Sequence, residues 1–586
     1  MTNSSSIPKI AENVAPPGYK LPTNPARASG RVTQGFVTPK HDRIPQVHSI
    51  PPKRVLPIIF LPGIMGSNLR MSAERQAQLE KTNNIAWRPE NKVASLELGF
   101  ASPAERQMQL DPEATEVDEY DPVNNPTGDP SETSDERNEN AKVKFRYSFD
   151  VGVDSPLLKD DPLGSTPRKL KEQKARERGW GEIFFDSYRN LLQMCERRLN
   201  TAFYRGNLDS WWMRILEVSP ELWQANTQPA LKPLEEKTLR AAVTGCWFPV
   251  HAMGYNWLQS NSISGRRVAE RITALIKRYQ DQGFQCEKVI LVTHSMGGLV
   301  ARAVIHPEMG KLNDKVLGIV HGVMPAIGAG AAYKRMRCGF EDSRLSIVPK
   351  ILGNYGDEVT AVLGNAQGGL ELLPSQAYGN NWLNVQHKNA TLLSLPKNGD
   401  PYEEIYKVRG KWYSLLREDW INPAARVNGS SFQVTCALLE RAKAFHNAIS
   451  NTYHDHSYAH YGAGMDGATW HRVVWRFEDS AKVFDVENLQ IATDSRQGRL
   501  EVIDPMHPLP PGNARPQFES LMQPGREPGD QTVPLHSAEH QLRSGKFKGI
   551  FRQNGYEHQD SYKHRAALYS TLYSLVHIAS TMKWSK

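Results

Sequence analysis

Ser295 has the surroundings of a serine nucleophile. Residues 288–293, KVILVT, form the continuous apolar run typical of a buried parallel strand, and residues 294–298, HSMGG, follow directly. A helix is predicted from about 296 to 305, so the serine falls at a strand-to-helix turn. Small neighbours let this turn be sharp, which lifts the hydroxyl above the sheet. We therefore predict that Ser295 attacks an ester carbonyl, with Thr293 in the place where a glycine usually precedes such a serine.

A histidine must take the proton of this serine. In the strand-turn-helix arrangement the chain order is serine, then an acid, then histidine. His558 lies in the segment GYEHQD, after a strand predicted near 546–551 and before a closing helix predicted from about 564 to 582. This is the last loop of such a sheet, so we predict that His558 is the general base, with His540 and His564 as alternatives.

The acid that orients the histidine is expected in the loop after the preceding strand. Asp530 stands there in a tight turn, GDQTVP. Asp504 and Glu527 are the alternatives. We predict that the carboxylate of Asp530 stabilises the imidazolium that forms during the reaction.

Ester cleavage by a serine also needs backbone N–H groups that bind the developing oxyanion, one after the serine and one from an earlier loop. Met296 supplies the first. The second is assigned to Ile64, in the glycine-rich segment FLPGIMGSN that follows a predicted strand at 55–61, with Met65 as the alternative. Glycines there let the backbone approach a substrate closely.

The elements that position these residues alternate along the chain. Apolar runs predict strands at 55–61, 247–252, 288–293 and 316–320, and apolar residues at helical spacing predict a helix after Ser264. Strands that alternate with helices build a doubly wound, mostly parallel sheet. The predicted fold class is therefore α/β, of the α/β-hydrolase type, with a large inserted cap domain.

Four regions are expected along the chain. Residues 1–52 form an extended N-terminal arm, 53–327 the first part of the core, with an acidic surface loop at about 110–140, 328–480 the inserted cap, and 481–586 the last part of the core. We expect the cap to line an acyl-binding cleft over Ser295 with apolar side chains, namely those of Trp382, Leu383, Trp412, Leu415, Leu416 and Trp420.

Composition narrows the class of protein. The 586 residues are 39% apolar and 23% charged, and the mean hydropathy is −0.54, which is typical of a folded soluble protein. The net charge of +8 is mild for this length, and we expect no nucleic-acid partner. The start of the chain has no apolar signal segment, and the five scattered cysteines suit a reducing cytosol. We expect synthesis in the cytoplasm without a signal peptide.

Four motifs in this order resemble a known group of lipases. PGIMGS at 62–67, GYNW at 254–257, HSMGG at 294–298 and GDQTVP at 529–534 are similar to motifs of the lecithin:cholesterol acyltransferase-like lipases and the GPI-inositol deacylases. In those families the last motif reads close to GDGTVP and its Asp is the triad acid, which implies the same role for Asp530 and the oxyanion role for Ile64. Gln531 replaces the Gly, and Asn256 replaces a common Asp.

Within that group the chain most resembles the bacterial type VI secretion lipase effectors. The resemblance implies a phospholipase A, with a lean towards the sn-1 position, that is delivered into rival bacteria and acts on membrane phospholipid in the target periplasm. It also implies two kinds of protein partner, the secretion apparatus and a cognate immunity protein that blocks the site in the producing cell. The alternatives are an acyltransferase that uses an alcohol in place of water, and a non-catalytic binding protein on a hydrolase scaffold.

Two weaker patterns have competing interpretations. His456 and His460 stand one turn apart if helical, so a metal site and packing histidines are both conceivable. Because the serine mechanism needs no metal, we expect neither a metal nor a cofactor. The tryptophans in the looser regions either touch lipid as part of a lid or pack the inserted domain, namely Trp211, Trp212, Trp382, Trp412 and Trp420.

Overall fold

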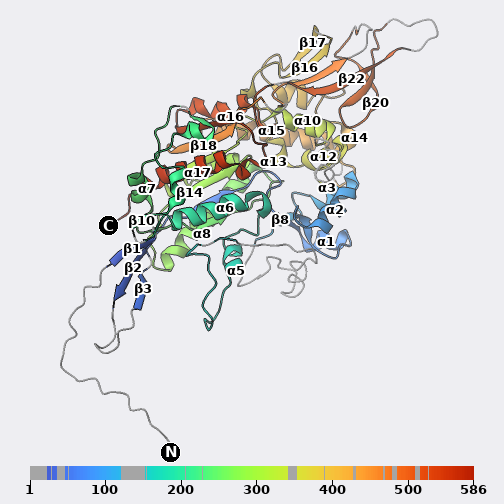
Figure 1. Cartoon of the computed structure of the whole chain (residues 1–586). Coiled ribbons are helices and arrows are strands. Elements are labelled where there is room, and N and C mark those ends of the chain that lie inside the picture. Colours follow the sequence, from blue (N-terminus) through green and yellow to red (C-terminus); the bar gives the residue numbers. More distant parts are fainter. Residues whose placement is uncertain are drawn as a thin grey trace, which may run out of the picture.

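The structure is a computed structural model of the whole chain (Figure 1). It describes the backbone of three strands before residue 52, and then residues 52–585 except 120–151, 341–350, 427–430, 466–468, 478–482, 508–514 and positions 154, 205, 228, 352, 389, 484 and 526.

A seven-stranded sheet forms the core, in the order β11-β23-β18-β15-β14-β5-β13. All neighbouring pairs are parallel except β11 with β23. The strands are β5 (Ile58–Leu61), β11 (Ala225–Thr227), β13 (Val250–Ala252), β14 (Val289–His294), β15 (Val316–Gly322), β18 (Ser457–Gly462) and β23 (Phe547–Gln553). The predicted α/β class with a mostly parallel sheet is confirmed.

Helices cover both faces of this sheet, and its central strands are therefore buried along their whole length. Ile59 and Leu291 point to one face and pack with helices α8 (Asn261–Asp281) and α9 (Gly297–Ile305). The side chains between them along the strands point to the other face and pack with α6 (Phe185–Asn200), α7 (Glu236–Val243) and α17 (Arg565–Ser580). A strand buried on both sides has no polar face, and its sequence does not alternate.

A second sheet of six strands builds most of the cap, in the order β17-β16-β19-β22-β21-β20. Figure 1 shows it beyond one end of the core, at the upper right. Its strands are β16 (Leu383–His387), β17 (Ala390–Leu395), β19 (Val473–Phe477), β20 (Gln490–Asp494), β21 (Arg499–Ile503) and β22 (Gln517–Pro524). Around it lie α10 (Gly330–Cys338), α12 (Gly356–Leu363), α13 (Gln367–Leu370), α14 (Glu418–Ile421) and α15 (Ser431–Ile449).

The cap boundaries differ from the predicted 328–480 and 481–586. The stretch predicted as one insertion contains β18, which pairs with β15 and β23 inside the core sheet. The stretch predicted as returning to the core contains β20, β21 and β22, which belong to the cap. The cap therefore comes from two insertions, one on each side of β18, and β16 joins them by pairing in parallel with β19.

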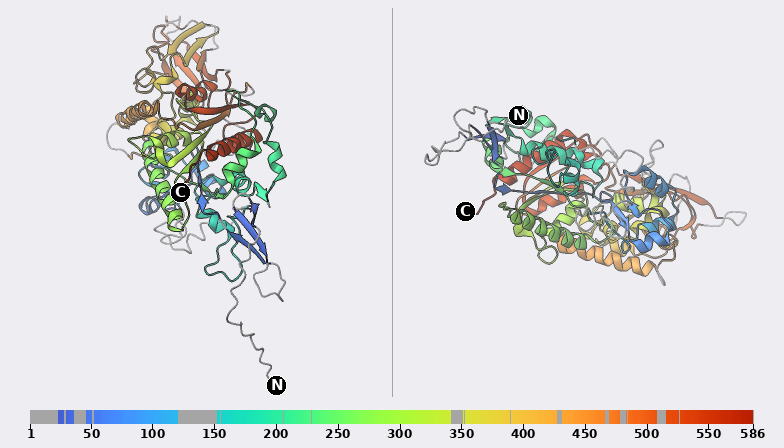
Figure 2. Two further views of the ribbon diagram at one scale, coloured as in Figure 1. Left: turned by 90° about the vertical axis from the view of Figure 1, so that its left-hand side faces the viewer. Right: turned by 90° about the horizontal axis from the view of Figure 1, so that it is seen from below.

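The N-terminal region contains β1 (Thr23–Arg27), β2 (Gly30–Gly35) and β3 (Gln46–Ile50), which form an antiparallel sheet rather than an extended arm. In Figure 2, left, these strands lie at the end of the molecule opposite the cap. The first part of the predicted acidic loop at about 110–140 contains β8 (Thr115–Val117). This strand pairs with β6 (Leu69–Met71), which also pairs with β7 (Ile85–Trp87). The rest of that loop, from 120, lies outside the described residues.

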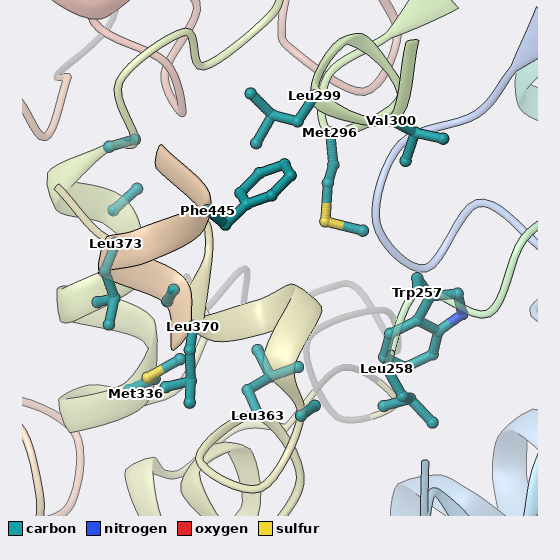
Figure 3. Close-up of a cluster of buried hydrophobic side chains, with 14 of the residues drawn as sticks. Trp257, Leu258, Met296, Leu299, Val300, Met336, Leu363, Leu370, Leu373 and Phe445 are labelled. Atoms are coloured by element: carbon teal, nitrogen blue, oxygen red, sulfur yellow. The ribbon is translucent and has the colours of Figure 1, made fainter. Parts of the chain in front are cut away.

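The core and the cap share one apolar interior. Figure 3 shows Met296 and Leu299 of the core facing a space that Met336, Leu363 and Phe445 of the cap also border. All five belong to the same buried cluster. No helix in the described ranges is both long and apolar enough to cross a bilayer.

Candidate active site

Ser295 occupies the turn between β14 and α9 in a strained conformation. Its φ is 51°, a left-handed value that non-glycine residues adopt only when the surrounding structure enforces it. The turn is tight against the loop after β5: a Cβ on Gly63 would lie 2.8 Å from Nδ1 of His294, and a Cβ on Gly297 would clash with the carbonyl oxygens of Leu61 and Pro62. Glycine is therefore required at both positions, because the loop after β5 and the turn at Ser295 approach each other closely.

The structure brings Ser295, His558 and Asp530 together. Nε2 of His558 lies 2.9 Å from Oγ of Ser295, and Nδ1 of His558 lies 2.8 Å from Oδ2 of Asp530. All three side chains are buried, although His558 and Ser295 border the cleft described below. A serine, a histidine and a carboxylate in this order and at these distances can activate the hydroxyl and stabilise an imidazolium.

Asp530 is held by its own turn. Its Oδ1 accepts hydrogen bonds from the amides of Thr532 at 3.2 Å and Val533 at 2.6 Å, which leaves Oδ2 to face the histidine. The amide of His558 donates to the carbonyl of Asp530 at 3.0 Å, so the two loops are joined directly. Gln531 has a φ of 72°, which explains why a glycine suits its position in the related motif.

The two alternatives for the acid have other partners. Glu527 pairs with His471 and Arg472. Asp504 is buried and accepts hydrogen bonds from the amides of Asp485 and Met506.

The two amides predicted for the oxyanion flank the serine. Met296 is the N-cap residue of α9, and Ile64 follows Gly63, which packs against Cβ of Ser295. Within the described part of the chain, neither amide donates a hydrogen bond to another protein group. Two unengaged N–H groups beside a nucleophile can bind an oxyanion. The neighbouring Met65 has a φ of 60°, and its carbonyl accepts from Nε1 of Trp87.

A cavity of about 710 Å³ opens at the serine. Its apolar lining comes from the loop after β5 and from the cap, where α10 contributes Ala331, Ala332 and Met336, and Phe340 and Leu363 follow. A hidden apolar cleft of this size suits an acyl chain.

The prediction of which side chains line this cleft is wrong. Trp382, Leu383, Trp412, Leu415, Leu416 and Trp420 are buried in the cap and do not line the cavity. Trp412 stacks edge-on against Trp475 of the second sheet, and Trp382 against Tyr333 and Tyr378. Trp212 is buried as well, and Trp211 is partly buried against it. Of the two interpretations of the tryptophans, packing is the one that the contacts support.

Tyr188 is a site residue that the motifs do not reveal. It comes from α6, and its hydroxyl accepts a hydrogen bond from the amide of Gly63 at 3.3 Å and lies 3.2 Å from Nδ1 of His294. The other nitrogen of His294, Nε2, lies 3.0 Å from the carbonyl oxygen of His558. A buried hydrogen-bond network therefore joins the loop after β5 that contains Gly63, the turn at His294 and Ser295, and the loop that carries His558. An amphipathic helix with Tyr on its buried face carries no signal that would distinguish this residue from ordinary core.

Protonation in this network follows from burial. Burial, together with the nearby His558 ring, lowers the pKa of His294 to about 3, so the ring is neutral. Because a carbonyl only accepts, Nε2 carries the hydrogen and Nδ1 is the acceptor. Burial raises the pKa of Tyr188 to about 12, so its hydroxyl keeps the proton that it donates to Nδ1.

Two other predicted positions have structural contacts. Asn256, in place of an Asp, donates to the carbonyl of Thr115 at 2.9 Å and accepts from the amide of Leu258 at 3.1 Å, so it ties β8 to the loop before α8. His460 lies within strand β18, and His456 just before it, so the helical spacing assumed for a metal pair is wrong. No group of three potential metal ligands occurs among the described residues.

Comparisons with known proteins support the fold. Residues 262–334, which include Ser295, match the model of the PGAP1-like alpha/beta domain. A chain from the crystal structure of the Tle4–Tli4 complex superposes with a TM-score of 0.68 at 29% sequence identity, over 90% of this chain and 99% of that chain. A search of curated protein sequences gave no match. The chain therefore has an α/β-hydrolase fold, is similar to the PGAP1-like domain over residues 262–334, and resembles a chain of the Tle4–Tli4 complex over nearly its whole length, which confirms the resemblance predicted from the motifs.

Proposed function

We propose that the protein is a serine esterase that cleaves the acyl esters of membrane phospholipids. The observation that carries this proposal is the hydrogen-bonded series Ser295, His558 and Asp530 at the wall of an apolar cleft. The series supplies the chemistry, and the cleft supplies a place for a fatty acyl chain.

The mechanism is acyl transfer to water. Oγ of Ser295 attacks the ester carbonyl while Nε2 of His558 takes its proton, and Asp530 stabilises the imidazolium. The amides of Ile64 and Met296 bind the oxyanion of the tetrahedral intermediate. The intermediate collapses, the leaving alcohol takes the proton from His558, and an acyl-enzyme remains. Water then gives a proton to His558 and attacks the acyl-enzyme. The second tetrahedral intermediate collapses and releases the fatty acid, and Oγ of Ser295 takes the proton back from His558.

The substrate class is glycerophospholipid, and we favour cleavage at the sn-1 position. No cofactor is needed for this chemistry. If an added alcohol replaced water as the acyl acceptor, the products would identify an acyltransferase. If neither reaction occurred, the chain would be a binding protein on a hydrolase scaffold.

We also propose that the protein is a type VI secretion effector, made in the cytoplasm and active at the membrane in the periplasm of a target cell. The four motifs support this, as does the similarity to a chain solved in the Tle4–Tli4 complex. By this proposal the secretion apparatus carries the chain, and a cognate immunity protein covers the cleft in the producing cell.

Position-labelled phospholipids test the reaction and its regiochemistry together. Ser295→Ala is expected to lose activity by a factor on the order of 10³ or more with the fold retained. Asp530→Asn and His558→Ala are expected to cost comparably large factors, and to add little to Ser295→Ala, because triad members act as a unit. Ser262→Ala, in the first turn of α8, is the matched control. Near-native hydrolysis by Ser295→Ala, or additive losses, would overturn the assignment.

A further inference from the structure

The proposed reaction determines which wall of the cleft the alcohol part of the substrate contacts. Nε2 of His558 returns the proton to the oxygen of the leaving alcohol, so this alcohol lies against the loop that carries His558. In a phospholipid the leaving alcohol carries the phosphate and the head group. The acyl chain takes the other side of the cleft, where α10 and Leu363 supply apolar side chains. We therefore expect the head group beside the loop that carries His558.

A second cavity, of about 250 Å³, lies at this loop. Its lining includes Tyr556 and Glu557, which directly precede His558, and Gln531, which directly follows Asp530. Glu557 lines both this side cavity and the cleft, so the two spaces adjoin at its side chain. The rest of the lining of the side cavity comes from Gln553, Gly464, Gly529 and Gly555.

Among the contacts of the described residues, the carboxylate of Glu557 is held by backbone amides and not by a cation. Its Oε1 accepts from the amide of Gln559 at 3.1 Å, and its Oε2 accepts from the amide of Asp560 at 3.2 Å. A carboxylate has about four lone-pair sites, so both oxygens can accept further hydrogen bonds. Asp560 differs, because Nζ of Lys563 lies 2.9 Å from its Oδ1. Glu557 therefore gives this wall a fixed negative charge that a cation of the substrate can meet.

Tyr556 offers an aromatic ring to the same space. The residue is partly exposed, whereas its hydroxyl oxygen is buried, so the ring and not the hydroxyl is what this side chain can present to a ligand in the side cavity. The face of a tyrosine ring carries partial negative charge and attracts cations, ammonium groups among them. A carboxylate and an aromatic ring that line one cavity suit an ammonium group, because one supplies charge and the other supplies an apolar surface that still attracts a cation.

From these observations we infer that Glu557 and the ring of Tyr556 form a subsite for an ammonium head group, that of ethanolamine or choline. The ammonium occupies the side cavity, the glycerol and phosphate lie against the loop that carries His558, and the acyl chain follows the apolar lining of the cleft. The inference rests on the proposed phospholipid substrate and adds that a positively charged head group is preferred to an uncharged one.

The test measures competition between two lipids in one micelle. Phosphatidylethanolamine and phosphatidylglycerol with the same acyl chains are mixed at equal, low mole fraction in neutral detergent micelles, and the initial ratio of the two lysophospholipid products gives the ratio of their kcat/KM values. Because both lipids share each micelle, binding of the protein to the micelle cancels from this ratio. We expect a preference of about three- to thirtyfold for phosphatidylethanolamine, the combined size of an exposed ion pair and a cation–π contact.

Two further lipids test whether the charge is what the subsite recognises. Phosphatidylcholine keeps the positive charge and should be preferred to phosphatidylglycerol as well. N-acetyl phosphatidylethanolamine lacks the charge and should compete no better than phosphatidylglycerol. If the acetylated lipid competed as well as phosphatidylethanolamine itself, the charge would not be recognised and the inference would be wrong.

Matched variants assign the preference to the two side chains. Glu557→Gln should lower it about two- to fivefold, since the amide keeps an acceptor for the loop and loses the charge, and Glu557→Asp should retain more of it. Tyr556→Leu should lower the preference by a similar factor, whereas Tyr556→Phe keeps the ring and should keep the preference. Glu270→Gln removes an exposed carboxylate of α8 that lines neither cavity and should leave the ratio unchanged.

The outcomes separate the two proposals. If the unaltered protein cleaves a soluble short-chain ester but no phospholipid, the proposed substrate is wrong. If it cleaves phospholipids with a ratio near one, or if Glu557→Gln and Tyr556→Leu lower both products equally and leave the ratio unchanged, the subsite is wrong and the proposed function stands. Equal loss of the preference in Tyr556→Phe and Tyr556→Leu would show that the ring is not the recognising group, and would also refute the subsite.

Discussion

Replacement of Tyr188 by phenylalanine tests the hydrogen-bond network behind the proposed triad. The change removes only a hydroxyl, which donates to Nδ1 of His294 and accepts from the amide of Gly63. The ring itself remains packed against Phe60, with 4.7 Å between the two ring centroids. Two buried polar groups, one on each side, then have no partner.

The magnitude follows from those two groups. A buried donor or acceptor without a partner costs about 1 to 3 kcal/mol, so Tyr188→Phe should lower the free energy of unfolding by about 2 to 6 kcal/mol. The oxyanion loop and the serine turn lose their common anchor, and small misplacements of reacting groups can cost up to about a hundredfold in rate. We expect kcat on a soluble ester to fall on the order of tenfold or more, with a smaller change in KM.

Denaturant unfolding and steady-state kinetics measure the two effects separately. The matched control is Tyr378→Phe, because the hydroxyl of Tyr378 is also buried and donates to the carbonyl of His471 in the cap, 3.0 Å away. The control should lose stability and keep kcat. If Tyr188→Phe kept kcat within twofold, or if both variants lost kcat to the same extent, Tyr188 would have no positioning role.

Three further predictions concern other parts of the structure. Gln531→Gly should raise the free energy of unfolding by about 0.5 to 1 kcal/mol in denaturant titrations. Glycine removes the strain of the φ of 72°, but the greater conformational entropy of glycine in the unfolded chain offsets part of this gain. A lower free energy of unfolding would show that the Gln531 side chain stabilises the loop that carries Asp530. His321→Leu should reduce the pH dependence of the free energy of unfolding. Burial lowers the pKa of His321 to about 3, so below about pH 6.5 this histidine is protonated only in the unfolded state. The native protein therefore loses stability as the pH falls. Unfolding titrations between about pH 4 and 6 should show a slope smaller by about 1.4 kcal/mol per pH unit, and an unchanged slope would contradict the assignment. Ala332→Trp should fill the cleft, so that hydrolysis of long-chain esters falls more than that of short-chain esters; equal losses would place the acyl chain elsewhere.

The three residues of the proposed triad were predictable because each has a local signature. Ser295 is specified by a continuous apolar strand, a small-residue turn and a helix that are contiguous in sequence, and the structure places all of them as expected. Asp530 and His558 each lie beside a turn or strand end with a recognisable pattern. Local sequence is sufficient where a residue's geometry is set by its own loop.

The cap was not predictable in the same way. Strand β16 pairs with β19, and about 90 residues of chain separate them, including the core strand β18. Strand β18 is buried along its whole length but reads SYAHYG, so no continuous apolar run marks it as a strand of the core sheet. The prediction that the tryptophans of the cap line the cleft was wrong for a related reason. Hydropathy indicates that a side chain is buried, and it does not indicate whether the surface that buries it is protein or substrate.

The second of the two cap insertions lies between β18 and Asp530 in the sequence. The chain leaves the core after β18, forms four strands of the second sheet, and returns to the end of β18 before Asp530, where Gly529 pairs with Gly464. The amide of Gly529 donates to the carbonyl of Gly464 at 3.1 Å, and that of His558 donates to the carbonyl of Asp530. These bonds tie the acid loop to the core on both sides, so the position of Asp530 does not depend on the strands inserted before it. The same loop carries Thr532, which contacts Arg335 of the cap. The loop that carries Asp530 is thus fixed to the core by its backbone and joined to the cap by a side chain.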